Sequence, residues 1–114
     1  MVAPAAGAVV LVRFPFSDLS QTKLRPAVVL AAVGRGDCIL CQITSKPYAD
    51  TSSIKLDNDA FESGSLQVTS YARPAKLFTA NQNLITSHVG NLKGATLQRI
   101  TQAVAGIVTA GRLP

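Results

Sequence analysis

The feature of this sequence that most constrains its fold is a series of short apolar or alternating segments, separated by brief polar turns. Most of these segments are rich in β-branched and apolar residues, which is typical of β-strands. No helical pattern alternates with them, so an antiparallel arrangement is expected instead of a parallel βαβ sheet. Strands are predicted at residues 8–14, 27–33, 38–44, 53–56, 65–71 and 76–79.

The period changes near the C-terminus. One apolar stripe at helical spacing predicts a helix of about four turns, formed by Leu97, Ile100, Val104, Ile107 and Val108. Thr96 is the predicted N-cap and Gly111 the predicted C-cap. Gly106 lacks a side chain, which would let another backbone approach the helix closely.

These elements predict one mainly β domain over residues 1–114, with residues 1–6 as a flexible tail. The glycine-containing turn at 34–37 joins two strands as a hairpin. Pro26 and Pro74 are expected at strand starts, because proline cannot donate to a strand ladder. A small, strongly bent sheet or barrel closed by the terminal helix accommodates all of this.

Charge is spread unevenly along the chain. Residues 1–62 carry six basic and six acidic side chains, whereas the remainder carries five basic side chains and no acid, which gives the net charge of +5. A basic surface suits a polyanion or an acidic protein, although an ordinary solvated surface can also be basic. The apolar runs are far shorter than the roughly 20 residues of a membrane span, so a soluble protein without a membrane partner is expected.

Cysteine and histidine offer little chemistry. Cys38 and Cys41 stand three residues apart, which places them on opposite faces of a strand and predicts two free thiols in a reducing cytoplasm. The single histidine, His88, is interpreted as a surface residue of a loop. No metal-binding spacing and no phosphate-loop motif occurs, so neither a metal nor another cofactor is expected.

Arginines and hydroxyl groups are the remaining candidates for chemistry. They lie at predicted strand ends or polar faces, where they could meet at one mouth of a barrel: Arg25, Thr44, Ser45, Thr69, Ser70 and Arg73. A guanidinium presents a planar set of donors that matches a phosphate. Equally, the arginines could pair with acids such as Asp18 while the hydroxyls cap turns, and residue chemistry alone leaves both readings open.

Four segments in this order resemble the PemK/MazF family of toxins: residues 9–18, 23–30, 42–45 and 70–79. The first contains Arg-Phe-Pro-Phe-Ser-Asp, the second Arg-Pro, the third Ile-Thr-Ser and the fourth a second Arg-Pro. Together they cover about residues 7–109. The resemblance therefore extends over nearly the whole chain.

The resemblance implies an SH3-like β-barrel of the PemK/MazF/CcdB type with a C-terminal helix, forming a cytoplasmic homodimer. It further implies a metal-independent endoribonuclease that cleaves single-stranded RNA through attack of the 2′-hydroxyl on the adjacent phosphorus. By position, Arg25 corresponds to the residue that stabilises the phosphorane, Thr44 to a donor on the same phosphate, and Arg73 to a second arginine near the scissile bond.

Two departures from the family pattern concern proton transfer. The loop before Arg25 lacks the Glu or His of many members, so Asp18 is the substitute base in this interpretation. Ala75 stands where some relatives have an aspartate. Further RNA contacts are assigned to Lys23, Ser45, Lys46, Thr69, Tyr71 and Lys76. Base stacking is assigned to Phe16, Tyr48, Tyr71 and Phe78, whereas Phe14 and Phe61 are assigned to the core.

The implied partner is an acidic antitoxin, through which alone the toxin would contact operator DNA. A polar loop region at residues 50–64 is expected beside the active mouth, where that partner would displace or order it. Two alternatives remain at this point. One is a barrel that binds nucleic acid or a protein target such as DNA gyrase without cleaving RNA, and the other is a dimeric scaffold with a degenerate site.

Overall fold

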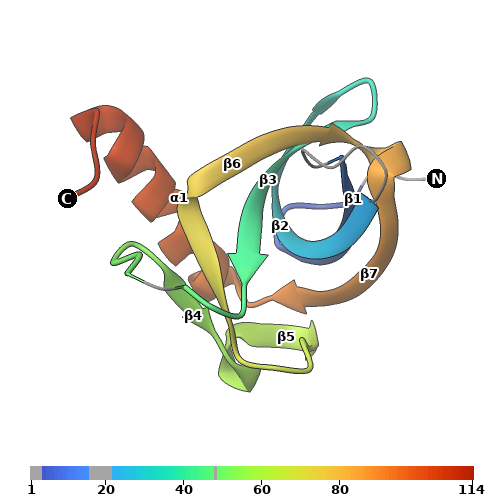
Figure 1. The fold of residues 1–114 in the computed structure, drawn as a ribbon, viewed down its shortest axis with the longest axis horizontal. Coiled ribbons are helices and arrows are strands. Elements are labelled where there is room, and N and C mark those ends of the chain that lie inside the picture. The colour runs from blue at the N-terminus through green and yellow to red at the C-terminus, as the bar shows by residue number, and fades with distance from the viewer. Residues whose placement is uncertain (1–3, 16–21, 48) are drawn as a thin grey trace.

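The computed structural model describes residues 4–15, 22–47 and 49–114, and these form a curled seven-stranded sheet with one long helix (Figure 1). The sheet order is β4-β6-β3-β2-β1-β7-β5, and every pairing is antiparallel. The elements are β1 (Ala8–Pro15), β2 (Thr22–Gly34), β3 (Asp37–Thr44), β4 (Ile54–Leu56), β5 (Phe61–Gly64), β6 (Ser70–Asn81), β7 (Ile85–Leu92) and α1 (Gly94–Ala110), with short 3-10 helices at Asn58–Ala60 and Gln82–Leu84.

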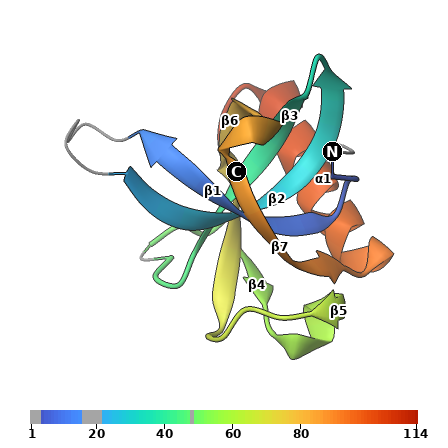
Figure 2. The ribbon, with the colours of Figure 1, turned by 90° about the vertical axis from the view of Figure 1, so that its right-hand side faces the viewer.

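The sheet bends so strongly that it forms a nearly closed barrel, which Figures 1 and 2 show from two directions. Register shifts interrupt the pairings of β1 with β7, β2 with β3, and β3 with β6. Such irregularities bend a strand locally and increase its twist. The predicted mainly β class with a C-terminal helix is confirmed.

The predicted hairpin at residues 34–37 is confirmed, and its conformation explains its sequence. Arg35 and Gly36, the two residues between β2 and β3, have φ angles of 55° and 80°. Positive φ at both central positions matches a type I′ turn, whose twist fits that of the flanking strands. Gly36 adopts this angle without the steric cost that a side chain would add.

Several predicted boundaries were wrong in the middle of the chain. Residues 65–69 alternate in polarity, yet they form a connection, and the strand begins only at Ser70. The alternation has another cause: Leu66 packs against the core, whereas Val68 is exposed. The strand predicted at 53–56 is confirmed as β4, whereas the rest of the polar region at 50–64, expected to be a loop, also contains a 3-10 helix and β5. In addition, no strand was predicted at residues 85–92, which form β7.

Both prolines lie within longer strands than predicted. Pro26 is inside β2, but pairing of β2 with β3 begins only at Ala27. Pro74 is inside β6, between Ala72, which pairs with Ile43, and Leu77, which pairs with Cys41 across a register shift. A missing N–H is tolerated where the regular ladder begins or is interrupted.

The helix begins earlier than predicted. Its N-cap is Lys93, and Thr96 instead lies inside the first turn, where its buried hydroxyl donates to the carbonyl oxygen of Ala60 at 3.1 Å. The predicted C-cap is confirmed, since Gly111 adopts a left-handed φ of 76° and its N–H bonds to the Ile107 carbonyl. Among the described residues, nothing lies within 4 Å of where a side chain at Gly106 would begin, so the expected close backbone approach is not found there.

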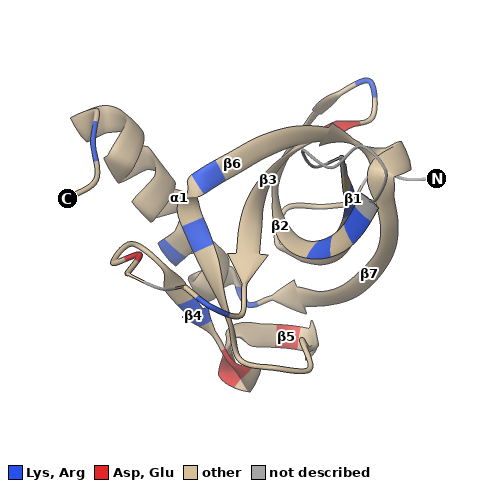
Figure 3. Cartoon of the chain, viewed as in Figure 1, with Lys and Arg blue, Asp and Glu red and all other residues tan. Residues whose placement is uncertain are grey.

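Figure 3 shows basic segments on β2, β4, β6 and α1, and acidic segments near the hairpin of β2 and β3, in the connection before β4, at the turn between β4 and β5 and on β5. Of the strands that carry these basic residues, β4 and β6 are adjacent in the sheet, and β3 alone separates them from β2. No helix of the described residues is long and apolar enough to cross a membrane.

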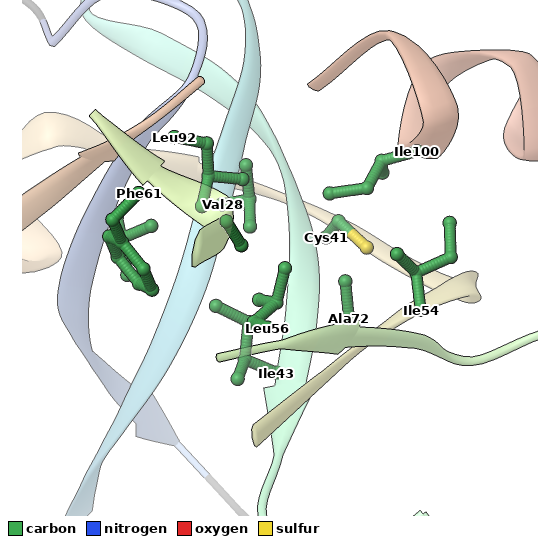
Figure 4. Close-up of a cluster of buried hydrophobic side chains, with 11 residues drawn as sticks. Val28, Cys41, Ile43, Ile54, Leu56, Phe61, Ala72, Leu92 and Ile100 are labelled. Carbon is green, nitrogen blue, oxygen red and sulfur yellow. The ribbon is translucent and has the colours of Figure 1, made fainter. Parts of the chain in front are cut away.

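Two buried clusters hold the barrel together on opposite faces of its strands. The first lies between the sheet and α1 and includes Cys41 and Ile100 (Figure 4). The second includes Cys38 and Leu40. Both cysteines are free and buried, so their predicted placement on opposite faces is confirmed. Burial raises the pKa of the Cys41 thiol to about 12.

The assignment of two phenylalanines to the core is also confirmed. Phe14 and Phe61 are both buried, and Phe61 belongs to the first cluster. The Phe14 ring meets that of Phe78 edge to face, with centroids 4.5 Å apart. Aromatic pairs in this arrangement stabilise a core beyond the area they bury.

Candidate functional site

Arg25 and Thr44 lie on the neighbouring strands β2 and β3 and line the same hollow. Ala27 of β2 pairs with Gln42 of β3, and Val28 pairs with Cys41. Arg25 stands two residues before Ala27 and Thr44 two residues after Gln42, so the same register, extended just beyond the paired residues, would place them opposite each other. Directly opposed residues of an antiparallel pair project from the same face of the sheet, with Cβ atoms about 5 Å apart. The two motifs that were separate in the sequence therefore meet.

Both residues line one hollow at this end of the sheet, with a volume of about 390 Å³. Lys23 and Ser45 also line it, and so does the buried Ser70. The remaining lining side chains are mostly apolar: Leu11, Leu24, Pro26, Ile43, Leu66 and Val68, together with Gln67. Of the described residues that line this hollow, none is acidic or aromatic.

The strand end fixes the Thr44 hydroxyl. Its Oγ1 accepts the N–H of Lys46 at 3.1 Å and donates to the Lys46 carbonyl oxygen at 3.2 Å. Such local bonds to the backbone tighten the turn that follows β3. A ligand that takes the hydroxyl hydrogen replaces only the bond to the Lys46 carbonyl.

Arg73 lies in a separate hollow of about 400 Å³, lined also by Asp50, Thr51 and Lys76. Its Nε donates to Oδ2 of Asp50 at 2.7 Å, in an ion pair whose side chains are 27% and 7% exposed. The other carboxylate oxygen of Asp50 accepts the N–H and the hydroxyl of Ser52, at 3.0 and 2.6 Å. The thiol of Cys41 donates to the Arg73 carbonyl at 3.2 Å.

Asp50 is the residue of this region that sequence reasoning missed. Hydrogen bonds from Ser52 and then from Arg73 hold the pKa of its carboxyl below the usual value. An ionised carboxylate on Nε leaves the outer nitrogens of the guanidinium to other acceptors. Asp50-Thr51-Ser52 indicates a local turn, but nothing in the sequence connects that turn with Arg73, which lies 23 residues further along the chain.

The other predicted contact residues divide between these places. Lys76 shares the hollow of Arg73, while Thr69 is exposed in the connection before β6. Lys46 is exposed just beyond β3, and the half-buried Tyr71 pairs with Thr44. Phe78, assigned to base stacking, packs instead against the second core cluster. The predictions for Phe16, Asp18 and Tyr48 lie outside the described residues.

The surface position predicted for His88 is confirmed, although the residue lies in β7 and not in a loop. Its Nε2 is 2.8 Å from the Gly90 carbonyl and 3.1 Å from Oδ1 of Asn91. Within the described ranges, no three His, Cys, Asp or Glu side chains gather as metal ligands would.

Known structures share this fold over almost the whole chain. An endoribonuclease in complex with its cognate antitoxin from a mycobacterial species covers 100% of this chain and 98% of its own, at 17% identity and a TM-score of 0.71. A MazE-MazF complex from Deinococcus radiodurans covers 96% and 98%, at 16% identity and a TM-score of 0.78. The toxin MazF-mt6 of Mycobacterium tuberculosis covers 90% and 96%, at 12% identity and a TM-score of 0.70.

At these identities the structural likeness concerns the fold alone. No curated protein sequence matches the chain. The family model described as "PemK-like, MazF-like toxin of type II toxin-antitoxin system" matches residues 5–108. This match covers all seven strands and most of α1. The chain therefore belongs to the PemK-like, MazF-like toxins of type II toxin-antitoxin systems.

Proposed function

We propose that this protein is an endoribonuclease that cleaves single-stranded RNA without a metal ion. The observation that carries the proposal is the meeting of Arg25 and Thr44 across β2 and β3, in a hollow with a second cation, Lys23. A binding module that does not cleave RNA has no need for an arginine and a hydroxyl aimed at the same place. Membership of the toxin family and the fold shared with a mycobacterial endoribonuclease support the same conclusion.

The reaction is attack of a ribose 2′-hydroxyl on the neighbouring phosphorus, which releases a 5′-hydroxyl and leaves a cyclic phosphate. The pentacoordinate phosphorane carries more negative charge than the substrate. Fixed donors already directed at that charge lower the barrier more than they stabilise the bound RNA. Arg25 supplies charged donors to the phosphorane, and Thr44 supplies one neutral donor in place of its bond to Lys46.

The proton from the 2′-hydroxyl needs an acceptor, and Asp18 remains the predicted base. Asp50 is poorly suited to that role, because its lowered pKa makes it a weak base and its oxygens are already bonded to Ser52 and Arg73. We assign Asp50 to holding Arg73. From its neighbouring hollow, Arg73 would contribute charge to the RNA backbone more than to the phosphorane.

Partners follow from the same proposal. An acidic antitoxin segment laid over the Arg25 hollow would exclude RNA by occupying the basic site. A cytoplasmic homodimer is proposed, since the apolar side chains left exposed include Val108 of α1, which is 72% exposed in one chain. Light scattering at micromolar concentration would measure twice the mass of one 11.9 kDa chain if the homodimer forms.

The direct test is incubation of purified protein with a long single-stranded RNA in excess chelator. Cleavage is expected to persist in the wild type and to be lost in Arg25→Ala and Thr44→Val. Arg99→Ala and Thr79→Val serve as matched controls, because both residues are exposed and neither lines the Arg25 hollow. Sequencing the 5′ ends of the fragments would reveal the preferred cleavage site at the same time.

The result that would overturn the proposal is intact RNA at high enzyme concentration. Equal cleavage by the wild type, Arg25→Ala and Thr44→Val would contradict the assigned site without excluding a nuclease. Binding of RNA without cleavage would favour the non-cleaving barrel instead.

A further inference from the structure

Lys55 of β4 belongs to the same row of residues as Arg25 and Thr44. Tyr71 of β6 pairs with Thr44 on one side and with Lys55 on the other. The β2–β3 register, extended two residues beyond Ala27 and Gln42, adds Arg25 beside Thr44, so the four residues follow one line across four adjacent strands, in the order β2, β3, β6 and β4. We call Arg25, Thr44, Tyr71 and Lys55 the transverse row.

All members of the transverse row project from one face of the sheet, because directly paired residues share a face. Burial agrees with this placement. Ile54 and Leu56, which flank Lys55, are buried in the first core cluster, so Lys55 must point to the other side. Ser70 and Ala72, which flank Tyr71, are likewise buried, whereas Tyr71 is only half-buried. The row therefore lies on the surface that the first cluster does not fill.

The chemistry of the row changes along its length in a way that suits a polynucleotide strand. A guanidinium and a hydroxyl stand at one end, an aromatic ring follows, and an ammonium stands at the other end. Neighbouring strands are about 4.8 Å apart, so the row extends over about 14 Å along the sheet. Single-stranded RNA is commonly held by cations on its phosphates and by aromatic rings on its bases.

The Lys55 side chain is available for such a contact. It is exposed, and none of the described residues forms an ion pair with its ammonium. Lys55 lies between the buried Ile54 and Leu56, which fixes the direction of its Cα–Cβ bond. The rest of its long side chain can still change rotamer. It can therefore follow a phosphate without forming a rigid site.

We propose that Lys55 binds an RNA phosphate beyond the scissile one, so that the bound strand runs across β2, β3, β6 and β4 along the transverse row. Tyr71 then stacks against a base between the two phosphates. This inference rests on the proposed function for the scissile end at Arg25, but it concerns binding. Lys55 takes no part in the chemical step.

The test measures the salt dependence of binding, because each phosphate neutralised by a cation releases counterions. The probe is a short, fluorescent, fully 2′-O-methylated single-stranded RNA of mixed sequence, which cannot be cleaved by attack of a 2′-hydroxyl. Binding weakens as salt rises, so the slope of log K against log salt is negative. Lys55→Gln is expected to make this slope less steep by about 0.7, the value for one phosphate of a single strand. Lys93→Gln, an exposed lysine at the start of α1, is the matched control and should leave the slope unchanged.

Two further readouts separate the roles within the row. Tyr71→Ala is expected to weaken binding similarly at every salt concentration, because stacking releases no counterions. In cleavage of unmodified RNA, Lys55→Gln should raise KM severalfold and leave kcat unchanged. Thermal unfolding of each variant checks that the fold is retained.

An unchanged salt slope in Lys55→Gln would overturn the inference, as would an equal loss of slope in Lys93→Gln or a wild type that binds no RNA at low salt. Failure of the proposed nuclease activity appears differently. In that case unmodified RNA stays intact, while the slope measured with the methylated probe still reports on Lys55.

Discussion

Arg25 and Arg73 each precede a proline in the sequence, but the protein surrounds them differently. Arg25 shares with Thr44 a hollow whose described lining contains a lysine and no acid. Arg73 is held at Nε by the nearly buried Asp50, which Ser52 holds in turn. The same dipeptide thus stands once in a hollow beside Lys23 and Thr44, where we propose that the RNA phosphate binds, and once in an ion pair with Asp50.

The different surroundings of Arg25 and Arg73 show that the charge of a side chain alone does not define a phosphate site. The carboxylate of Asp50 offsets much of the field that Arg73 would otherwise exert, since opposite charges in direct contact screen each other at longer range. What remains to Arg73 is its orientation and its outer donors. We therefore propose that Arg25 binds the phosphorane and that Arg73 makes a supporting contact.

The largest expected effect separates the two arginines directly. Arg25→Ala should lower the single-turnover cleavage rate by about 10²- to 10³-fold, the loss expected when a preorganised donor to a transition-state charge is removed. Arg73→Ala should cost much less. Equal losses in the two variants, measured with Arg99→Ala as the control, would remove the distinction drawn between the two hollows.

A smaller effect, on stability, is expected from removing the carboxylate that pairs with Arg73. Asp50→Asn should lower the free energy of unfolding by about 1–2 kcal/mol, because it weakens the three charge-assisted hydrogen bonds that the carboxylate accepts and leaves the arginine without its counter-charge. Asp59→Asn, at an exposed position, should change stability little. Urea unfolding measures both, and repeating Asp50→Asn in Arg73→Ala should show most of the cost removed.

Acid should weaken the same ion pair. The pKa of Asp50 is lower in the folded protein than in the unfolded chain, owing to Ser52 and Arg73. Its stabilising contribution is therefore complete above the unfolded value of about 3.9 and is lost as the pH falls through the folded value. The difference in melting temperature between wild type and Asp50→Asn should shrink below about pH 4. A difference that stays constant well below pH 4 would mean that the carboxylate charge is not what stabilises Arg73.

The smallest expected effect concerns the backbone of Arg73. Cys41→Ala removes the thiol that donates to the Arg73 carbonyl and should cost about 1 kcal/mol of stability through the space left in the core. Cleavage should be almost unchanged, because the guanidinium keeps its bond to Asp50. Cys38→Ala, in the other core cluster, is the matched control, and a loss of cleavage confined to Cys41→Ala would show that the backbone of Arg73 matters more than its ion pair.

Local patterns predicted those parts of the molecule that local chemistry determines. The turn at 34–37 needed a glycine with positive φ, and the stripe through Ile100 needed a core to cover. Residues 85–92 gave no strand signal, because Ser87, His88, Gly90 and Asn91 have little intrinsic preference for strands and pair there through tertiary context. Thr96 has the chemistry of a cap, but a buried carbonyl of Ala60 binds its hydroxyl instead.

The residues of the candidate site likewise fall into those that local sequence predicts and those that depend on tertiary structure. Arg25 and Thr44 could be proposed from motifs, since both stand at the ends of predicted strands. Asp50 and Lys55 could not be proposed, because one depends on a turn that folds onto β6 and the other on the register of β4. Register fixes which side chains share a face, and no periodicity within a three-residue strand such as β4 reveals its partner.

The most direct test of the central claim is a double-mutant cycle on Arg25 and Thr44, measured as single-turnover cleavage of one RNA in the presence of chelator. If both residues act on the same phosphorane, Arg25→Ala combined with Thr44→Val should be far less impaired than the product of the two single effects predicts. Single effects that multiply in full would contradict the claim, because they would show that the two side chains work independently.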